Sequence, residues 1–104
     1  MRPSPTLDEA IDLLRQYKHV KAKHFAEMPE VLLFGSYSKG TANKDSDIDV
    51  AIIVPSYGDW KLELSKALWH DVDAVSLLIE PVLISNDQPS PLYDDVMRTG
   101  IAVW

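Results

Sequence analysis

Two short apolar runs on either side of a polar segment most constrain what this chain can fold into. Val31–Phe34 is fully apolar, and Ile48–Val54 is rich in β-branched residues. The first run ends at Gly35-Ser36 and the second at Pro55, which are residue types that favour turns. Short apolar runs bounded in this way predict buried β-strands. We therefore expect a β-sheet in the core of the fold.

Helix signals flank these strands. Thr6–Glu9 matches a capping box, in which the Thr and Glu side chains each accept a hydrogen bond from the other residue's backbone N–H. Apolar residues then recur at the helical period as far as Tyr17. The sequence further predicts one helical turn within Tyr37–Ser46, a helix around Trp60–Leu68, a strand in Ala74–Ile84 and a last helix from Ser90 to Gly100.

The resulting order of elements is helix, strand, turn, strand, helix, strand, helix, without repeats or an internal linker. This order predicts an α/β (α+β) fold, with a small mixed β-sheet flanked by helices. A length of 104 residues favours a single domain over 1–104, and the 46% apolar content supplies its core. The chain has no Cys, which excludes Cys-ligated zinc, iron–sulfur clusters, disulfide scaffolds and thiol catalysis.

The charge balance is acidic, with 10 Lys and Arg against 16 Asp and Glu and a net charge of −6. This argues against nucleic acid as the main partner, because binding to its backbone is driven by neutralisation of phosphates. Nucleotides remain compatible if metal ions bridge the charges. The apolar runs fall far short of the ~20 residues that a membrane-spanning helix needs, and the chain begins without an apolar signal region. We expect a cytoplasmic protein.

Two carboxylates open the second predicted strand. Because side chains alternate between the faces of a strand, Asp47 and Asp49 project to one side, whereas Ile48 and Val50 project to the other. Like charges held this close repel each other unless they share a cation. The pair therefore predicts a divalent-metal site, and Mg²⁺ suits it because this ion takes one or two carboxylates and fills its other positions with water and phosphate.

A third acidic residue and a phosphate-binding turn would complete such a site. Glu80 lies inside an apolar strand segment, where a charge is unexpected unless it faces a solvated or metal-lined cleft. Asp73, just before that strand, is the competing candidate. Gly35 lets a ligand approach the backbone closely, and a helical turn that begins at Ser36 would present N–H groups and a hydroxyl to an anion.

These residues resemble the nucleotidyltransferase superfamily related to DNA polymerase beta, and in particular its minimal nucleotidyltransferases. The family pattern is Gly-Ser, ten residues, then Asp-x-Asp, and Gly35-Ser36 and Asp47-Ile48-Asp49 meet it. The resemblance implies the polymerase-beta-like fold. It also implies that Asp47 and Asp49 bind two Mg²⁺ ions, that Gly35 and Ser36 hold the phosphates of ATP or another nucleoside triphosphate, and that Glu80 takes the third catalytic, metal-binding position.

The resemblance also implies a partner. Minimal nucleotidyltransferases are commonly paired with a helical HEPN protein, often as the antitoxin that neutralises a HEPN ribonuclease by adenylylating it on tyrosine or by binding it. The leading expectation is therefore Mg²⁺-dependent adenylyl transfer to a hydroxyl of a HEPN toxin, with Asp49 or Glu80 receiving the proton. The alternative is a catalytically silent module that neutralises its partner by occlusion. Transfer to a small molecule is disfavoured, because the chain lacks a second recognition domain.

Several residues also have ordinary structural interpretations. Glu80 could instead be a charge that protects an edge strand from pairing, with Pro81 helping. Lys39 and Lys44 could contact a triphosphate, although loop lysines are usually only solvated. The remaining aromatic and histidine residues are expected to be core or interface anchors (Trp60, Trp69, Trp104), to pack beside the loop (Tyr37) or to lie at the surface (His19, His24, His70). The apolar tail to Trp104 would suit an interface between copies of the chain.

Overall fold

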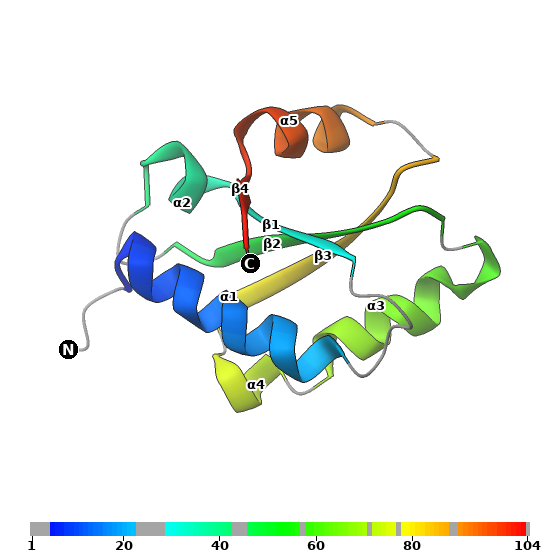
Figure 1. Ribbon diagram of the computed structural model, residues 1–104, viewed down its shortest axis with the longest axis horizontal. Helices are drawn as coiled ribbons and strands as arrows, with labels where there is room; N and C mark the ends of the chain where they lie inside the picture. Colours follow the sequence, from blue (N-terminus) through cyan, green and yellow to red (C-terminus); the bar gives the residue numbers. More distant parts are fainter. Residues whose placement is uncertain are drawn as a thin grey trace.

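A computed structural model describes residues 5–22, 29–42, 46–56, 58–70, 72–76, 78–87 and 90–103, with the side chains at 73 and 74 left out (Figure 1). Its helices are α1 (Leu7–Lys21), α2 (Ser36–Lys39), α3 (Lys61–Trp69), α4 (Val72–Val75) and α5 (Pro91–Thr99), with a 3₁₀ turn η2 (Gly58–Trp60) before α3. Its strands are β1 (Glu30–Phe34), β2 (Ile48–Val54), β3 (Ile79–Ser85) and β4 (Ile101–Ala102). The predicted α/β fold with a small mixed sheet is confirmed.

The four strands form one sheet in the order β3-β2-β1-β4. β1 is antiparallel to both β2 and β4, whereas β2 and β3 are parallel. In this register Phe34, the last residue of β1, lies opposite Asp49, and Asp49 lies opposite Glu80. The end of β1 and the beginnings of β2 and β3 therefore meet at the same end of the sheet.

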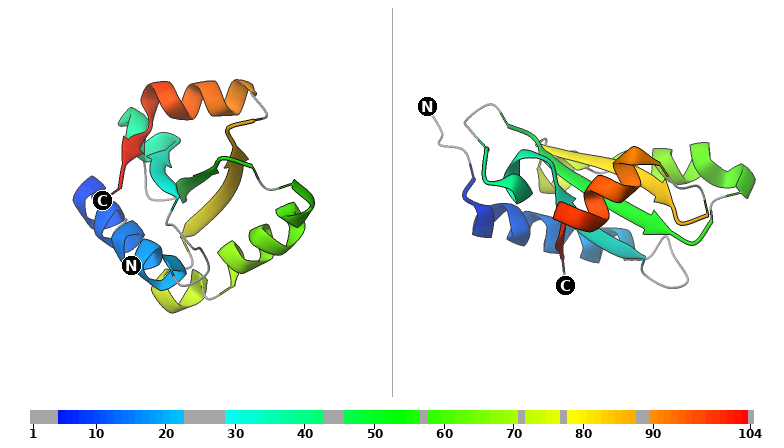
Figure 2. Two further views of the ribbon diagram at one scale, coloured as in Figure 1. Left: turned by 45° about the vertical axis from the view of Figure 1, so that its right-hand side comes forward. Right: turned by 90° about the horizontal axis from the view of Figure 1, so that it is seen from above.

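Helices cover both faces of the sheet. α1, α3 and α4 lie on one face, and α5 lies on the other (Figure 2). Alternate residues of β2 divide between these layers as a strand requires. Ile48, Val50 and Ile52 pack in the larger core cluster with residues of α1, whereas Ala51 and Ile53 pack in the cluster that contains Val96 of α5.

The helix starts follow the predicted capping. The Thr6 hydroxyl oxygen accepts a hydrogen bond from the Glu9 N–H at 3.2 Å, and the Glu9 carboxylate accepts one from the Thr6 N–H at 3.0 Å. At the start of α5, the Ser90 hydroxyl oxygen accepts a hydrogen bond from the Tyr93 N–H at 3.1 Å, and Pro91 occupies the first turn. Both helices therefore begin where these side chains satisfy unpaired backbone donors.

One prediction about the later elements is wrong in part, and one strand was not predicted. Ala74 lies in α4 and not in a strand, because Val72 packs into the core from a helical turn closed by the Ser76 N–H donating to the Val72 carbonyl oxygen at 2.9 Å. The apolar tail forms the edge strand β4, and the chain continues along β1 with the Val103 N–H donating to the Val31 carbonyl oxygen at 2.9 Å. Packing of Val72 thus overrides the strand preference at the beginning of the predicted Ala74–Ile84 segment.

Two of the tryptophans expected to be core or interface anchors, Trp60 and Trp69, lie at the surface and not in the core. Trp60 and Trp69 are 67% and 52% exposed. Trp60 directly precedes α3 and Trp69 is its last residue, whereas the buried residue of this helix is Leu68. Trp104, like Lys44 and His24, lies outside the described residues. Across the described ranges, no helix has both the length and the apolar character needed to cross a membrane.

Candidate active site

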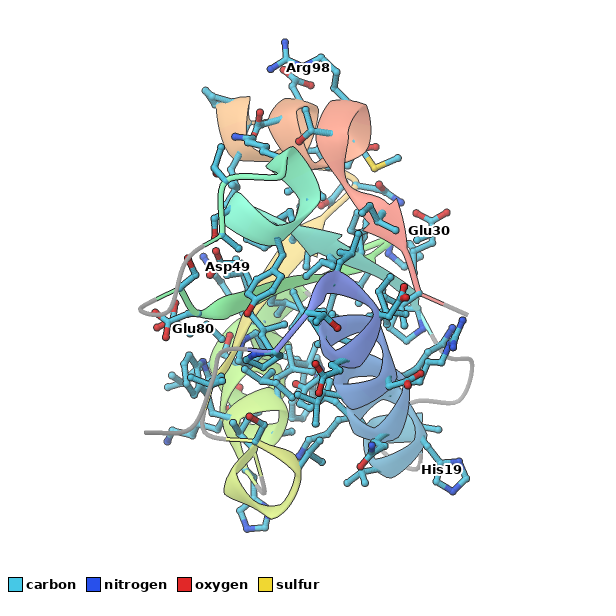
Figure 3. The ribbon with its side chains drawn as sticks, turned by 90° about the vertical axis from the view of Figure 1, so that its left-hand side faces the viewer. His19, Glu30, Asp49, Glu80 and Arg98 are labelled. Carbon is cyan, nitrogen blue, oxygen red and sulfur yellow. The ribbon has the colours of Figure 1, made fainter. Side chains whose placement is uncertain are left out.

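Three carboxylates gather at the end of the sheet where β2 and β3 begin. Asp47 directly precedes β2, and Asp49 and Glu80 are the second residues of β2 and β3. Since Asp49 and Glu80 are register partners on neighbouring parallel strands, their side chains leave the same face of the sheet, which is the face that carries α5. Figure 3 shows the two acids next to each other, below α2 and α5.

The acids influence one another's protonation. The pKa of Asp49 is raised, mainly because the carboxyl group is partly buried and also because Asp47 is negatively charged. The pKa of Glu80 is raised by burial and then by the charges of Asp47 and Asp49. The interaction between the two carboxyl groups lowers the pKa of Asp49 but raises that of Glu80. A positive charge placed among these carboxylates would relieve their mutual repulsion.

The donor set fits a hard divalent cation. Carboxylate oxygens are the protein ligands that Mg²⁺ prefers, and one or two of them are sufficient when water and phosphate oxygens fill the other positions. Within the described part of the chain, no three His, Cys, Asp or Glu side chains converge as a complete ligand set.

Glu80 and Asp73 are the two candidates for the third carboxylate of the predicted metal site. Glu80 faces Asp49 across β2 and β3. β3 is also an edge strand, which explains why Pro81 is tolerated there. The side chain of the competitor, Asp73, lies outside the described part of the structure. Glu80 thus lies on an edge strand, as its structural interpretation expects, and beside Asp49, as the metal-site interpretation expects.

Gly35 joins the sheet to the turn above the acids. Its φ of 74° is in the region that favours glycine. A Cβ atom at this position would overlap Oδ2 of Asp49 and lie 3.2 Å from its Cγ. Ser36 follows as the first residue of α2, where the first N–H groups of a helix have no partner within it. The predicted phosphate-binding turn and the predicted metal ligands therefore lie against each other.

The single turn of α2 is attached to both helical layers. The buried Tyr37 donates its hydroxyl to the Pro5 carbonyl oxygen at 3.0 Å, before α1. Lys39 forms an ion pair with Asp95 of α5, with Nζ 3.1 Å from Oδ2. The prediction that Lys39 is only solvated or contacts phosphate did not include Asp95. The two residues are 56 positions apart, and no local pattern links them.

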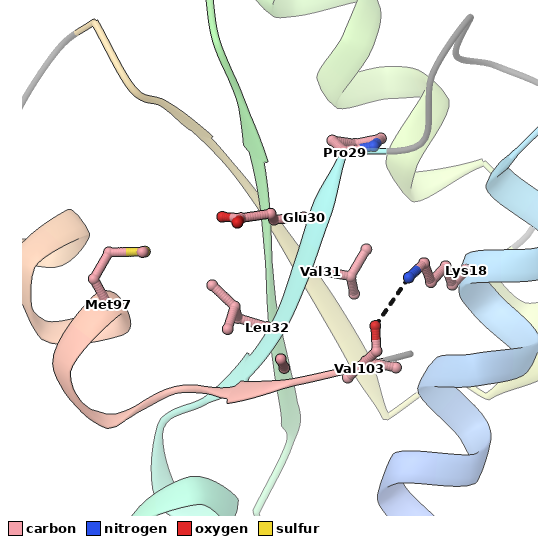
Figure 4. Close-up of a pocket in the computed structure, with 8 residues that line it drawn as sticks. Lys18, Pro29, Glu30, Val31, Leu32, Met97 and Val103 are labelled. Carbon is pink, nitrogen blue, oxygen red and sulfur yellow. Dashed lines mark hydrogen bonds between the residues drawn. The ribbon is translucent and has the colours of Figure 1, made fainter.

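A separate concavity lies at the β4 edge of the sheet. It has a volume of about 300 Å³ and is lined mainly by apolar side chains, among them Leu32, Met97 and Val103 (Figure 4). The Lys18 ammonium group at its rim donates to the Val103 carbonyl oxygen at 2.9 Å. No residue of the acidic cluster lines it, so it is not part of the candidate site.

Comparisons with known proteins agree with this geometry. The family described as nucleotidyltransferase domain matches residues 16–95. Protein adenylyltransferase MntA of Shewanella oneidensis is 45% identical over 80 residues, which cover 71% of this chain and 52% of that protein. The chain thus spans about half the length of this relative.

Two solved structures share the fold. One is a crystal structure of a proposed nucleotidyltransferase from Sulfolobus solfataricus, with a TM-score of 0.68, 16% identity, and coverage of 100% of this chain and 91% of that one. The other is a crystal structure of a toxin–antitoxin with AMP-PNP, with a TM-score of 0.57, 23% identity, and coverage of 86% and 72%. At these identities the likeness establishes the fold and nothing further.

Proposed function

Because this chain belongs to the nucleotidyltransferase domain family, we propose that it transfers an adenylyl group from ATP to a hydroxyl group of a partner protein. The partner is a helical HEPN toxin, and the chain is the antitoxin of the pair. The name of the Shewanella oneidensis relative supports the reaction, and the toxin–antitoxin structure with AMP-PNP supports the setting. Since ATP is the donor, the reaction belongs in the cytoplasm.

The observation that carries this proposal is the contact of the Gly35 turn with Asp49, which itself lies beside Glu80. Phosphates held at Gly35 and Ser36 would lie directly against the carboxylates. Asp47, Asp49 and Glu80 would hold Mg²⁺, which when bound supplies the positive charge that stabilises phosphoryl oxygens and lowers the pKa of an acceptor hydroxyl. The charge repulsion among these acids is the feature that such an ion would relieve.

The proposed reaction is a substitution at the α-phosphorus of ATP. The acceptor oxygen forms a bond to this phosphorus, the bond from the phosphorus to the oxygen that bridges to the β-phosphate breaks, and pyrophosphate leaves. The hydroxyl proton passes to Asp49 or Glu80, which lie side by side at the start of β2 and β3. The backbone at Gly35 and Ser36 orients the leaving phosphates. The chain contributes mainly position and a charge-complementary surface.

The test is transfer of label from α-phosphate-labelled ATP to protein in an extract of the source organism. We expect a Mg²⁺-dependent labelled band with the wild type, and at least about a hundredfold less label with the Asp47→Asn, Asp49→Asn double variant, as is typical when transition-state charge stabilisation is lost. The Asp8→Asn, Asp12→Asn double variant is the matched control, because it removes two exposed carboxylates from α1.

A measurement of partner neutralisation beside the labelling assay separates transfer from occlusion. If no triphosphate labels a protein, while the wild type and the Asp47→Asn, Asp49→Asn variant neutralise the partner equally well, then the chain is a binding module without catalysis and the proposal is wrong.

A further inference from the structure

The segment that carries the proposed phosphate-binding turn is too short to be stable by itself. α2 has four residues, from Ser36 to Lys39. An isolated helix of this length does not form in water, because the entropy cost of the first turn exceeds the gain from one or two hydrogen bonds. The place of this turn relative to the acids therefore depends on contacts that α2 makes with other elements.

These contacts hold α2 at both ends. At its start, Gly35 packs against the Asp49 carboxylate, and the buried Tyr37 donates to the Pro5 carbonyl oxygen. At its end, the chain turns away through Gly40, in the left-handed conformation with φ of 74°. Here the Lys39 ammonium group reaches across to Asp95 at 3.1 Å. This ion pair ties the last residue of α2 to α5.

Asp95 is well placed for this task. Val96, its neighbour on α5, is fully buried against the sheet, so the helix is fixed to the face that carries the acids. The Asp95 side chain is only 28% exposed. Its second oxygen pairs with Arg98 at 3.2 Å, a contact within α5 itself. The hydrogen bond from Lys39 lowers the pKa of Asp95, so the carboxylate is ionised and committed to this pair at neutral pH.

We propose that Asp95 is a positioning residue of the nucleotidyl-transfer site: by holding Lys39 against α5, it fixes the Gly35–Ser36 turn relative to Asp49 and Glu80. The inference rests on the proposed function and deepens it. It assigns Lys39 to a partner in the protein and not to the nucleotide. Loss of the pair would let α2 move relative to the acids, so a bound triphosphate would meet a poorly formed site.

The test compares binding of Mg²⁺ with AMP-PNP, by calorimetry, to the full chain and its variants. We expect Asp95→Asn to raise Kd by about 2- to 5-fold, the range that coupling in a surface ion pair allows. Exchanging the charges, with Lys39→Asp and Asp95→Lys together in an Arg98→Ala background that removes the neighbouring positive charge, should return Kd to within about twofold of the wild type. Arg98→Ala is the matched control, since Arg98 is 76% exposed and its loss breaks only the pair within α5.

Amide hydrogen exchange without nucleotide provides a second measurement. The Lys39 and Thr41 N–H groups donate to the carbonyl oxygens of Gly35 and Ser36 at 3.1 and 2.9 Å. Asp95→Asn should speed exchange at both amides, whereas Arg98→Ala should not.

Three outcomes would overturn the assignment. If Asp95→Asn binds AMP-PNP as tightly as the wild type or more tightly, the pair does not position the turn. If the exchanged pair binds as weakly as Asp95→Asn, Lys39 contacts the phosphates directly. If the wild type itself binds no AMP-PNP, the proposed function fails and this role fails with it, a result distinct from equal binding by wild type and variant.

Discussion

At the scale of single residues, Gly35 is where the turn and the acidic cluster constrain each other. An Ala here would place a methyl group on the Asp49 carboxylate, and its φ of 74° would be strained. We expect Gly35→Ala to lose adenylyl transfer by tenfold or more (~1.4 kcal/mol) and to destabilise the fold by about 1–3 kcal/mol. Transfer and chemical unfolding would be measured side by side.

Gly40→Ala is the control for this prediction. Gly40 has the same φ of 74°, but nothing lies within 4 Å of an added Cβ. The strain alone should cost about 1–2 kcal/mol of stability. Equal losses of transfer in the two variants would mean that the contact with Asp49 is unimportant for the site.

The raised pKa of Asp49 leads to a second prediction, about how the stability of the fold depends on pH. An acid whose pKa is raised in the folded state destabilises the fold above that pKa, because its charged form is disfavoured there, and has no effect well below its ordinary value. For Asp49 the ordinary value is 3.8, and burial is the first cause of the increase. Without divalent ions, Asp49→Asn should therefore raise Tm at pH 7 by a few degrees and leave it nearly unchanged near pH 3.

Thermal melts in a chelator at the two pH values check this. A variant that melts below the wild type at pH 7 would show that the carboxylate stabilises the fold, which is the opposite of what the cluster predicts. Asp12→Asn, at an exposed position of α1, serves for comparison.

At the scale of elements, the buried side chain of Lys21, the last residue of α1, joins this helix to the end of α3. Lys21, which is 1% exposed, donates to the Ala67 carbonyl oxygen at 2.7 Å and to that of His70. Lys21→Met should leave these acceptors without their charged donor and lower the free energy of unfolding by about 1–3 kcal/mol. Each kcal/mol lost lowers Tm by roughly 4–8 °C. Lys66→Met, at an exposed position of α3, should change Tm little. Equal effects of the two substitutions on Tm would contradict the prediction.

Elements were predictable from sequence where one local interaction decides them. The Thr6–Glu9 capping box fixes the start of α1, and Ser90 with Pro91 fixes the start of α5. α4 and β4 depend instead on distant partners. Val72 is helical because the core accepts it in that conformation, and β4 exists because β1 offers it a free edge. Neither partner can be read from a neighbouring position in the chain.

At the scale of the whole molecule, strand pairing decides how much of the site could be predicted. The shared face of Asp47 and Asp49 follows from alternation along one strand, so the sequence alone predicts it. That Glu80 faces Asp49 depends on the parallel register of β2 and β3, and that Lys39 meets Asp95 depends on the layer formed by α5. Long-range pairing of this kind leaves no periodic signal.

The net charge of the chain suggests a test of the metal site that needs no partner. A ligand that binds only the folded state stabilises it by RT ln(1 + [L]/Kd), about 1.4 kcal/mol when Mg²⁺ is present at ten times its Kd. We therefore expect Mg²⁺ to raise Tm by about 5–10 °C at pH 7. Above Kd the rise should grow with the logarithm of the Mg²⁺ concentration, and it should disappear in an Asp49→Asn, Glu80→Gln variant.

The control must separate this binding from general screening. A chain with a net charge of −6 is stabilised by any salt that weakens repulsion among its carboxylates. NaCl at matched ionic strength gives the rise in Tm that is due to screening alone. If NaCl gives the same rise, or if the variant keeps the rise with Mg²⁺, then Mg²⁺ acts on the overall charge and the cluster of Asp49 and Glu80 is not its site. A rise specific to Mg²⁺ and to these two residues would locate the ion without any measurement of catalysis.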